Sequence, residues 1–181
     1  RRLAENGQVE LSVPPYSHPI VPLLLDFRSA REALPESPLP RYDGYPGGRE
    51  RARWQIREGI ATFRRHFGIE PEGCWPSEGA VSEGTLGLLA DDGFAWAATG
   101  EGVLGNSLGD AYDKYGEDLS TSLCHPYRVG QNGTACFFRD DELSDLIGFQ
   151  YSDWHADDAV GDLIHRLEEI AEATSNQPDP V

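Results

Sequence analysis

Two carboxylates stand at places where the sequence predicts that a strand ends and a helix begins. Glu78 lies in the stretch GCWPSEG, in which Trp75 and Pro76 make the local chain apolar and stiff. Asp140 ends the stretch ACFFRD, whose paired phenylalanines are typical of a buried strand. Two acids from different strand ends can face each other across a pocket, which is what glycoside hydrolysis needs. One acid acts as nucleophile or base and the other as general acid, and their mutual repulsion keeps one of them protonated near neutral pH.

Each acid also has a structural explanation that the local sequence leaves open. Acidic residues favour the first turn of a helix, so Glu78 could serve only the helix that follows it. Asp140 could equally be the N-cap of a helix whose first turn holds Asp141 and Glu142. The local sequence therefore does not decide between catalysis and helix capping for either acid.

A proline-rich stretch near the N-terminus supplies further candidates. Tyr16 and His18 lie in PPYSHP, where their side chains could hydrogen-bond the hydroxyl groups of a sugar. The alternative for His18 is a histidine that hydrogen-bonds backbone groups within a rigid loop. We expect Trp75 at the site because it belongs to the same stretch as the first acid. We expect Trp54 and Trp96 in the core.

The elements that must position these residues alternate between strand-like and helix-like patterns. Alternating or continuous apolar residues predict strands, and apolar residues at intervals of three and four predict helices. The expected order is a strand over 7–13, a helix within 47–71, a strand ending at Glu78, a helix over 81–93, a strand over 94–99, a strand over 135–140, a short helix over 141–151 and a helix over 155–173. A polar, glycine-rich loop is expected after residue 99, and the stretch QNGT predicts a hairpin turn. This order predicts an α/β fold with a parallel sheet, open or barrel-like, in which functional residues gather at the strand ends.

Length and composition are typical of one globular domain. The 181 residues, of which 39% are hydrophobic and 25% charged, are enough to form a real core. Residues 29–48 are rich in proline, glycine and arginine and are expected to form a surface excursion. Residues 174–181 are expected to form a frayed tail. Because methionine is absent and the sequence opens in the middle of an element, we expect a fragment that is truncated at both ends.

Charge and missing motifs argue against several classes of function. The 31 acidic and 15 basic residues give a formal net charge of −16, which argues against nucleic acid or an anionic membrane as a partner. No apolar run approaches the roughly 20 residues of a membrane helix. No signal peptide opens the sequence, so a cytoplasmic location is slightly favoured. The three cysteines, Cys74, Cys124 and Cys136, lack the spacing of a zinc site or a disulfide framework and are expected to be buried.

At four stretches the sequence resembles glycoside hydrolase family 57, in particular the branch of enzymes like amylopullulanase and α-amylase. These stretches are GQVELSVPPYSHPIVPLL, GCWPSEGAVSEGTLGLLADDGFAWAATGEGVL, PYRVG and FFRDDELSDLIGFQYSDW, and together they span most of the chain. The resemblance implies part of an incomplete (β/α)7 barrel, which works without a metal or other cofactor. It also implies that Glu78 is the nucleophile and Asp140 the general acid/base. The expected substrate-binding residues are His18, Tyr16, Trp75, Asp141 and Asp145.

The implied reaction is a double displacement on an α-glucan or maltooligosaccharide. Asp140 would protonate the leaving glycosidic oxygen while Glu78 attacks the anomeric carbon, and water would then release the glycosyl group with retention of configuration. α-1,4 linkages are the expected target, with α-1,6 linkages as a further candidate. Three alternatives stay open: transfer to another sugar by a 4-α-glucanotransferase or branching enzyme, a catalytically impaired carbohydrate-binding protein, and a metal-dependent carbohydrate deacetylase on a related barrel. The deacetylase would need an Asp and His cluster around a metal, which the sequence does not offer.

The sequence departs from the family pattern at two places in these stretches. Asp141 stands where the family usually has histidine, and Gly100 stands where an acid usually precedes Glu101. Either change could remove a sugar contact or alter the preference for particular substrates. The family's N-terminal His-x-Gln-Pro motif and its C-terminal helical region are expected to lie outside this fragment, which by itself could be inactive.

Overall fold

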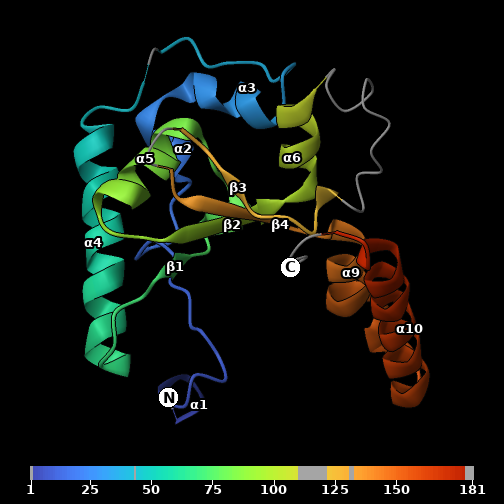
Figure 1. Cartoon of the computed structure of the whole chain (residues 1–181). Coiled ribbons are helices and arrows are strands. Elements are labelled where there is room, and N and C mark those ends of the chain that lie inside the picture. Colours follow the sequence, from blue (N-terminus) through green and yellow to red (C-terminus); the bar gives the residue numbers. More distant parts are fainter. Residues whose placement is uncertain (1, 43, 110–121, 131–132, 178–181) are drawn as a thin grey trace. The chain divides into compact units, whose positions relative to one another are not determined.

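Figure 1 shows the elements of the computed structural model of this chain. The structure describes residues 2–42, 44–109, 122–130 and 133–177. The chain forms two compact units. Unit 1 comprises Arg1–Thr99 and Tyr127–Phe137, and unit 2 comprises Gly100–Pro126 and Phe138–Val181. Glu78 therefore belongs to unit 1 and Asp140 to unit 2.

A four-stranded sheet in the order β1-β2-β4-β3 is the main β element of unit 1 (Figure 1). Its strands are β1 (Gly73–Cys74), β2 (Trp96–Gly100), β3 (Tyr127–Arg128) and β4 (Ala135–Arg139). β1 and β2 are parallel, whereas β3 and β4 are antiparallel. The prediction of an α/β fold is confirmed. The sheet is mixed rather than wholly parallel, because the predicted hairpin adds β3 beside β4; the tip of that hairpin, residues 131–132, lies outside the described residues.

Two predicted strands are shorter than the sequence pattern indicates. The strand expected over 7–13 is reduced to a parallel bridge between Val13 and Cys74, with the Val13 amide donating to the Gly73 carbonyl at 3.1 Å. Pro14 and Pro15 follow directly, and they have no amide hydrogen with which to continue the ladder. The strand expected to reach Glu78 stops at Cys74, because the chain turns sharply after Pro76.

The long helix of unit 1 confirms the helical periodicity of the sequence. The helical elements of this unit are α1 (Arg2–Glu5), α2 (Val21–Leu25), the 3-10 turn Phe27–Ser29, α3 (Ala30–Ala33), α4 (Gly48–Phe67), the 3-10 turn Ser77–Gly79 and α5 (Glu83–Asp91). In α4, Ile56 and Phe63 are buried, and Gly68 ends the helix in the left-handed conformation. α5 begins after Ser82, whose hydroxyl accepts the Thr85 amide hydrogen as predicted for an N-cap. α2 packs against both α4 and α5.

The expectation that Trp54 belongs to the core is wrong. Trp54 is 54% exposed, because it lies two residues, or about 200° around the helix, from the buried Ile56. Trp96 is partly buried: its ring contacts Phe137 at 5.8 Å between centroids, and its indole N–H donates to Glu10 at 2.6 Å. The two tryptophans therefore differ in environment although the sequence assigns them the same role.

Apart from the last residues of β2 and β4, the regular structure in the described part of unit 2 is helical. Its elements are α6 (Glu101–Leu108), α9 (Asp141–Asp145), the π-helical turn Leu146–Gln150, the 3-10 turn Tyr151–Asp153 and α10 (Ala156–Thr174). α6 replaces part of the polar loop expected after β2, and the burial of Leu104 explains why this glycine-rich stretch is ordered as a helix. The helix predicted over 155–173 is confirmed as α10. The expected tail is described only as far as residue 177.

The three cysteines lie where the sequence predicts. Cys74, Cys124 and Cys136 are buried, as the sequence predicts. Burial raises the pKa of the Cys74 thiol to about 12 and that of Cys136 to about 11. Across the described residues, no helix combines the length and the apolar character needed to cross a membrane.

Candidate active site

Glu78 lies in a sharp turn directly after β1. The turn is the 3-10 element Ser77–Gly79, in which Glu78 has a φ of +56° and Gly79 a φ of +66°. The Gly79 amide donates to the Pro76 carbonyl at 2.9 Å, which closes the turn. A glycine adopts this left-handed conformation freely, but a glutamate does so at a cost of about 1–2 kcal/mol. Strain of this kind persists only where the surrounding structure enforces it.

The neighbouring strand holds this turn in place. Thr99, in β2, is fully buried, and its hydroxyl donates to the Gly79 carbonyl at 2.5 Å. Ser77 is also buried, and its hydroxyl has no hydrogen-bond partner among the described residues. Thr99 thus holds the backbone directly after Glu78, while the Glu78 side chain itself is 76% exposed.

His18 is the side chain that meets Glu78. Its Nε2 lies 3.2 Å from Glu78 Oε1, although 60 residues separate the two along the chain. His18 also has a positive φ, of +58°, so these are the two non-glycine residues in the described part of the chain with left-handed backbone. An exposed ion pair of this kind contributes little to stability. The two strained residues in contact therefore indicate a functional site rather than a stabilising pair.

The loop that carries His18 is tied to α4. The Tyr16 amide donates to the Gln55 backbone carbonyl at 3.0 Å. The Ser17 amide and hydroxyl both donate to the Gln55 side-chain oxygen, at 2.8 and 2.9 Å. Gly59 permits this close approach, because a Cβ there would lie 2.8 Å from the Pro14 carbonyl oxygen. The loop is therefore a rigid support for His18, not a mobile segment that happens to reach Glu78.

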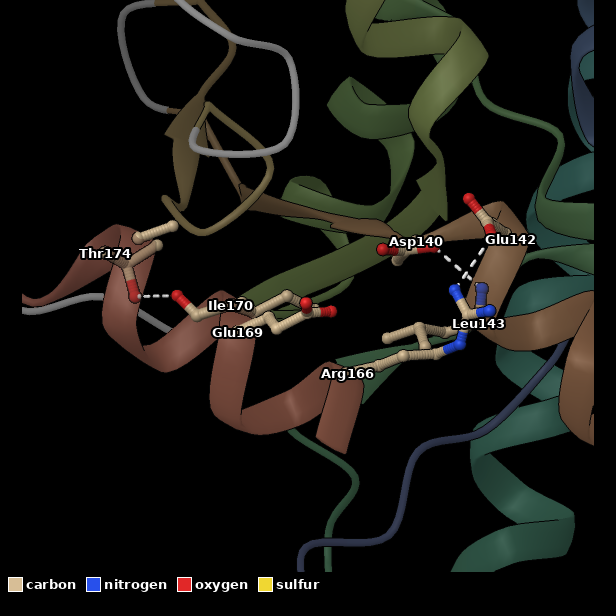
Figure 2. Close-up of a pocket in the computed structure, with 8 residues that line it drawn as sticks. Asp140, Glu142, Leu143, Arg166, Glu169, Ile170 and Thr174 are labelled. Atoms are coloured by element: carbon tan, nitrogen blue, oxygen red, sulfur yellow. Dashed lines mark hydrogen bonds and ion pairs between the residues drawn. The ribbon is translucent and has the colours of Figure 1, made fainter. Parts of the chain in front are cut away.

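Asp140 caps α9, as the structural explanation of this residue requires. Its Oδ1 accepts the Leu143 amide hydrogen at 2.8 Å. Asp140 also lines a pocket of about 260 Å³ within unit 2 (Figure 2). The residues around this pocket are Asp140, Glu142, Leu143, Arg166, Glu169, Ile170, Ala173 and Thr174. Asp140 therefore caps α9 and lines the pocket at the same time, and its role as a cap is compatible with a role in binding or catalysis.

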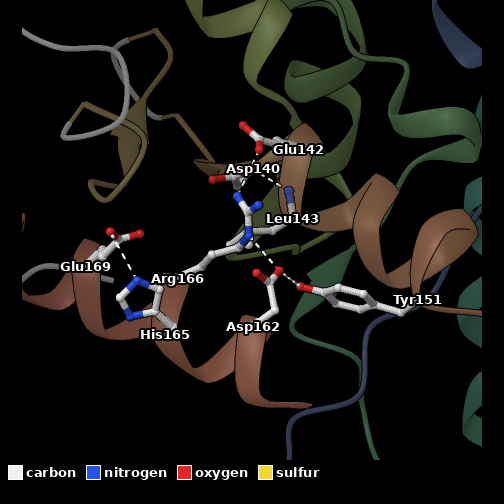
Figure 3. A network of polar contacts seen from close by, with 8 residues as sticks. All are labelled: Asp140, Glu142, Leu143, Tyr151, Asp162, His165, Arg166 and Glu169. Carbon is white, nitrogen blue, oxygen red and sulfur yellow. Dashed lines mark hydrogen bonds and ion pairs between the residues drawn. The ribbon is translucent and has the colours of Figure 1, made fainter. Parts of the chain in front are cut away.

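A polar network centred on Arg166 joins α10 to α9 and to the turn after it (Figure 3). Arg166 donates to Asp162 Oδ2 and to Glu142 Oε1, both at 2.9 Å, and the Tyr151 hydroxyl donates to the same Asp162 oxygen at 2.7 Å. The hydrogen bonds from Tyr151 and Arg166 hold the pKa of the Asp162 carboxyl below its usual range. Burial, with the bonded Asp162 carboxylate, raises the pKa of Tyr151. The network fixes the start of the helix that Asp140 caps.

The two departures from the family pattern contact each other in unit 2. A Cβ on Gly100 would lie 2.9 and 3.1 Å from the two carboxylate oxygens of Asp141. Arg139 donates to Asp141 Oδ1 through Nε at 2.9 Å and through Nη2 at 2.7 Å, and the Asp141 amide donates to Glu101 at 3.3 Å. An acid at position 100 would place a second carboxylate against Asp141. The glycine and the aspartate are therefore a matched pair, although the sequence presents them as two separate changes.

The predicted residues fall into two groups, one in each unit. The structure brings His18 and Glu78 into contact, with Tyr16 on the same loop as His18 and a partly exposed Trp75 in the stretch that leads to Glu78. Asp140 and Asp141 are adjacent in unit 2, and Asp145 ends α9 as an exposed residue. Within the described ranges, no group of three or more His, Cys, Asp or Glu side chains is placed to hold a metal ion.

Sequence reasoning missed three residues that shape these groups. Thr99 and Gln55 act through the backbone of Glu78 and of the His18 loop, and their sequence context, AAT and WQI, carries no motif that would reveal this. Trp54 is expected in the core, yet its ring contacts the Tyr16 ring at 5.8 Å between centroids. The helical phase of Trp54 relative to Ile56 is the one signal that predicts its exposure.

The described residues form a mixed α/β protein in which one candidate acid follows β1 and another follows β4. Comparison with known proteins identifies the family to which the chain belongs. The family model described as glycosyl hydrolase family 57 matches residues 1–181, and the chain belongs to that family. No curated protein matches the chain.

Two solved structures are similar in fold. One is the 4-α-glucanotransferase from Thermococcus litoralis, with a TM-score of 0.60 and 20% identity over 99% of this chain. The other is the α-amylase AmyC from Thermotoga maritima, with a TM-score of 0.52 and 18% identity over 81% of this chain. This chain spans 22% of the length of each of those proteins. At these identities the likeness is one of fold.

Proposed function

We propose that this chain is part of the catalytic domain of a retaining glycoside hydrolase that acts on α-glucans. Glu78 carries this proposal: it belongs to a family 57 chain, it is held in a strained turn, and its exposed carboxylate is contacted by His18. α-1,4 linkages are the proposed target, and α-1,6 linkages are a further candidate. No cofactor is needed for the proposed reaction.

The proposed mechanism has two steps. Glu78 attacks the anomeric carbon of the bound glucosyl unit, while Asp140 donates a proton to the leaving glycosidic oxygen. The resulting glycosyl ester on Glu78 is then attacked by water, from which Asp140 takes the proton. Because Asp140 Oδ1 accepts the Leu143 amide hydrogen, Oδ2 is the oxygen proposed to carry the transferred proton. His18 fixes the Glu78 carboxylate, and Tyr16, Trp75, Asp141 and Asp145 are proposed to contact sugar.

The barrel architecture is also part of the proposal. The parallel pairing of β1 with β2 across α5, and the parallel bridge from Val13 to Cys74, support a segment of an incomplete (β/α)7 barrel. Residues 1–181 would then be a part of the catalytic domain, with a surface excursion at 29–48 and a tail at 174–181. In such a barrel catalytic residues gather where strands end, and Glu78 and Asp140 each follow the end of a strand.

A second candidate is transfer to a sugar acceptor instead of water. The likeness in fold to the Thermococcus litoralis protein favours it, since that protein is a 4-α-glucanotransferase. Hydrolysis and transfer share the first step, and they differ in the hydroxyl that Asp140 activates in the second. The distribution of oligosaccharide lengths after incubation with maltoheptaose separates them, because transfer produces chains longer than the starting sugar.

The proposal is tested by following the products of maltooligosaccharide cleavage by proton NMR. A retaining reaction releases the α-anomer first, and mutarotation then produces the β-anomer. Glu78→Gln and Asp140→Asn should each lower turnover by at least about a thousandfold, as expected when a covalent or proton-transfer group is lost. Initial release of the β-anomer, or full activity of Glu78→Gln, would overturn the proposal.

A further inference from the structure

Two exposed aromatic rings meet beside the His18 loop in unit 1. Tyr16, on that loop, and Trp54, on α4, have their ring centroids 5.8 Å apart with an angle of 83° between the ring planes. Tyr16 is 50% exposed and Trp54 is 54% exposed. The two perpendicular rings thus form an apolar corner open to solvent. Single exposed aromatics are common on protein surfaces, but a paired and fixed corner of this kind requires an explanation.

The corner is built rigidly from two elements. Gln55, the residue after Trp54, accepts the Tyr16 amide hydrogen at its backbone carbonyl, and its side chain accepts both hydrogens that Ser17 offers. One residue of α4 thereby fixes the loop against the helix. The bare backbone of Gly59 lets the loop lie directly against α4 one turn further on. The rings are therefore held in position before any ligand arrives, which lowers the entropy lost on binding.

The same loop connects the corner to Glu78. Tyr16 precedes His18 by two residues, so their backbones lie within about 7 Å of each other. His18 Nε2 in turn lies 3.2 Å from Glu78 Oε1. The corner therefore lies on the same short loop as the residue that contacts the proposed nucleophile, two residues away from it. The corner is placed to bind a part of the ligand other than the unit that reacts.

We propose that Tyr16 and Trp54 form a stacking subsite for a glucosyl unit of an α-glucan, one that is remote from the bond cleaved at Glu78. This inference rests on the proposed function. The apolar C–H face of a pyranose packs on one ring while its edge meets the perpendicular ring, and the Tyr16 hydroxyl can hydrogen-bond the hydroxyl groups at the sugar's rim. Trp54 is therefore a specificity residue that favours long chains over short ones.

The test is calorimetric titration of the protein with maltose and with maltohexaose, in a Glu78→Gln background so that the sugars are not consumed. Trp54→Ala should weaken maltohexaose binding about tenfold, the size expected for one lost aromatic contact, and should change maltose binding by less than about twofold. Trp54→Phe keeps an aromatic face and should retain most of the affinity. Trp154→Ala, which removes an exposed tryptophan of unit 2, is the matched control and should bind both sugars as before.

Each outcome decides the inference. If Trp54→Ala binds each sugar as tightly as its parent does, the subsite is overturned and the proposed function stands. Failure of the parent to bind either sugar would overturn both. Tryptophan fluorescence supplies a second measurement if Trp54→Ala folds poorly. The part of the quenching or shift that maltohexaose causes and maltose does not should disappear in Trp54→Phe and persist in Trp154→Phe. Persistence of that part in Trp54→Phe would contradict the subsite.

Discussion

At the scale of single residues, Glu78 owes its position to its backbone more than to its side-chain contacts. Its carboxylate is exposed and meets His18, whereas the turn beneath it is held by the buried Thr99. The peptide groups therefore determine where the carboxylate points. Different residues therefore determine the strain in the turn and the contacts of the Glu78 carboxylate, so that the two can be tested by separate substitutions.

Thr99→Val tests the support under the turn. Valine has nearly the same shape as threonine but no hydroxyl, so the Gly79 carbonyl would lose its hydrogen bond from β2. We expect the free energy of unfolding to fall by about 1–3 kcal/mol, the usual effect of leaving a buried polar group unpaired. Urea denaturation measures the loss. Thr99→Ser keeps the hydroxyl and should retain more of the stability than the valine variant; the reverse order would contradict the role given to this hydrogen bond.

Glu78→Gly tests the strain itself. Glycine adopts the left-handed conformation without a steric penalty, so the substitution should raise the free energy of unfolding by about 0.5–1 kcal/mol while it removes the carboxylate. Thermal and urea unfolding measure this gain. Glu168→Gly is the matched comparison in a regular part of α10 and should destabilise by about 1 kcal/mol. A destabilised Glu78→Gly variant would show that the turn is not strained in the way described.

At the scale of elements, the junction between α6 and α9 depends on the pairing of Gly100 with Asp141. Gly100→Asp should destabilise the protein by about 1–3 kcal/mol, because its Cβ and its charge would meet the Asp141 carboxylate. In the Asp141→His background the same substitution should be tolerated better, since the carboxylate is gone. A double-mutant cycle measured by denaturant unfolding gives the coupling. Additive effects, with no coupling, would mean that the two departures from the family pattern are independent.

The network that fixes α9 against α10 makes a pH-dependent contribution to stability. Because the folded-state pKa of Asp162 is lowered, this carboxylate contributes stability above its unfolded pKa of about 3.9 and loses it as the pH falls through the lower folded value. The free energy of unfolding should therefore fall more steeply below about pH 4 in the parent protein than in Asp162→Asn. Denaturant unfolding across that range checks the difference. If the free energy of unfolding depends on pH equally in both proteins, Asp162 makes no pH-dependent contribution to stability.

The sequence predicted those elements whose own residues decide their structure. The helices α4, α5 and α10 show apolar periodicity and end signals such as Ser82 and Gly68, so local chemistry is enough to place them. The strand over 7–13 was wrong because a strand also needs a partner, and alternation alone does not provide one. The sequence did not predict α6, because the glycines and polar residues of Glu101–Leu108 are typical of a loop. The burial of Leu104, which favours the helix, cannot be read from the sequence.

The site was predictable to a similar extent. Residue types and motif frames pointed to His18 and Glu78, and the structure brings them together. Their left-handed backbones and the support from Thr99 depend on residues far apart in the chain, which no local pattern reports. Asp140 illustrates the opposite case, since the capping explanation was available from the sequence and is what the structure contains, alongside a pocket that the sequence did not reveal.

At the scale of the whole molecule, the proposed mechanism uses one acid from each compact unit. Unit 1 supplies Glu78 with its histidine and aromatic surroundings, and unit 2 supplies Asp140 with the network that fixes its helix. The proposed double displacement requires both acids to act on one glycosidic bond. The claim on which everything else depends is that Glu78 forms a covalent bond to sugar during the reaction.

The most direct test is to trap that bond. A 5-fluoro-α-glucosyl fluoride reacts with a retaining glycosidase but leaves the glycosyl ester to hydrolyse slowly, so the labelled protein can be digested and sequenced by mass spectrometry. We predict one added glycosyl group on the peptide containing GCWPSEG, located at Glu78, and no label in Glu78→Gln. A label on another carboxylate, or no covalent adduct in a protein that turns over maltooligosaccharides, would contradict it.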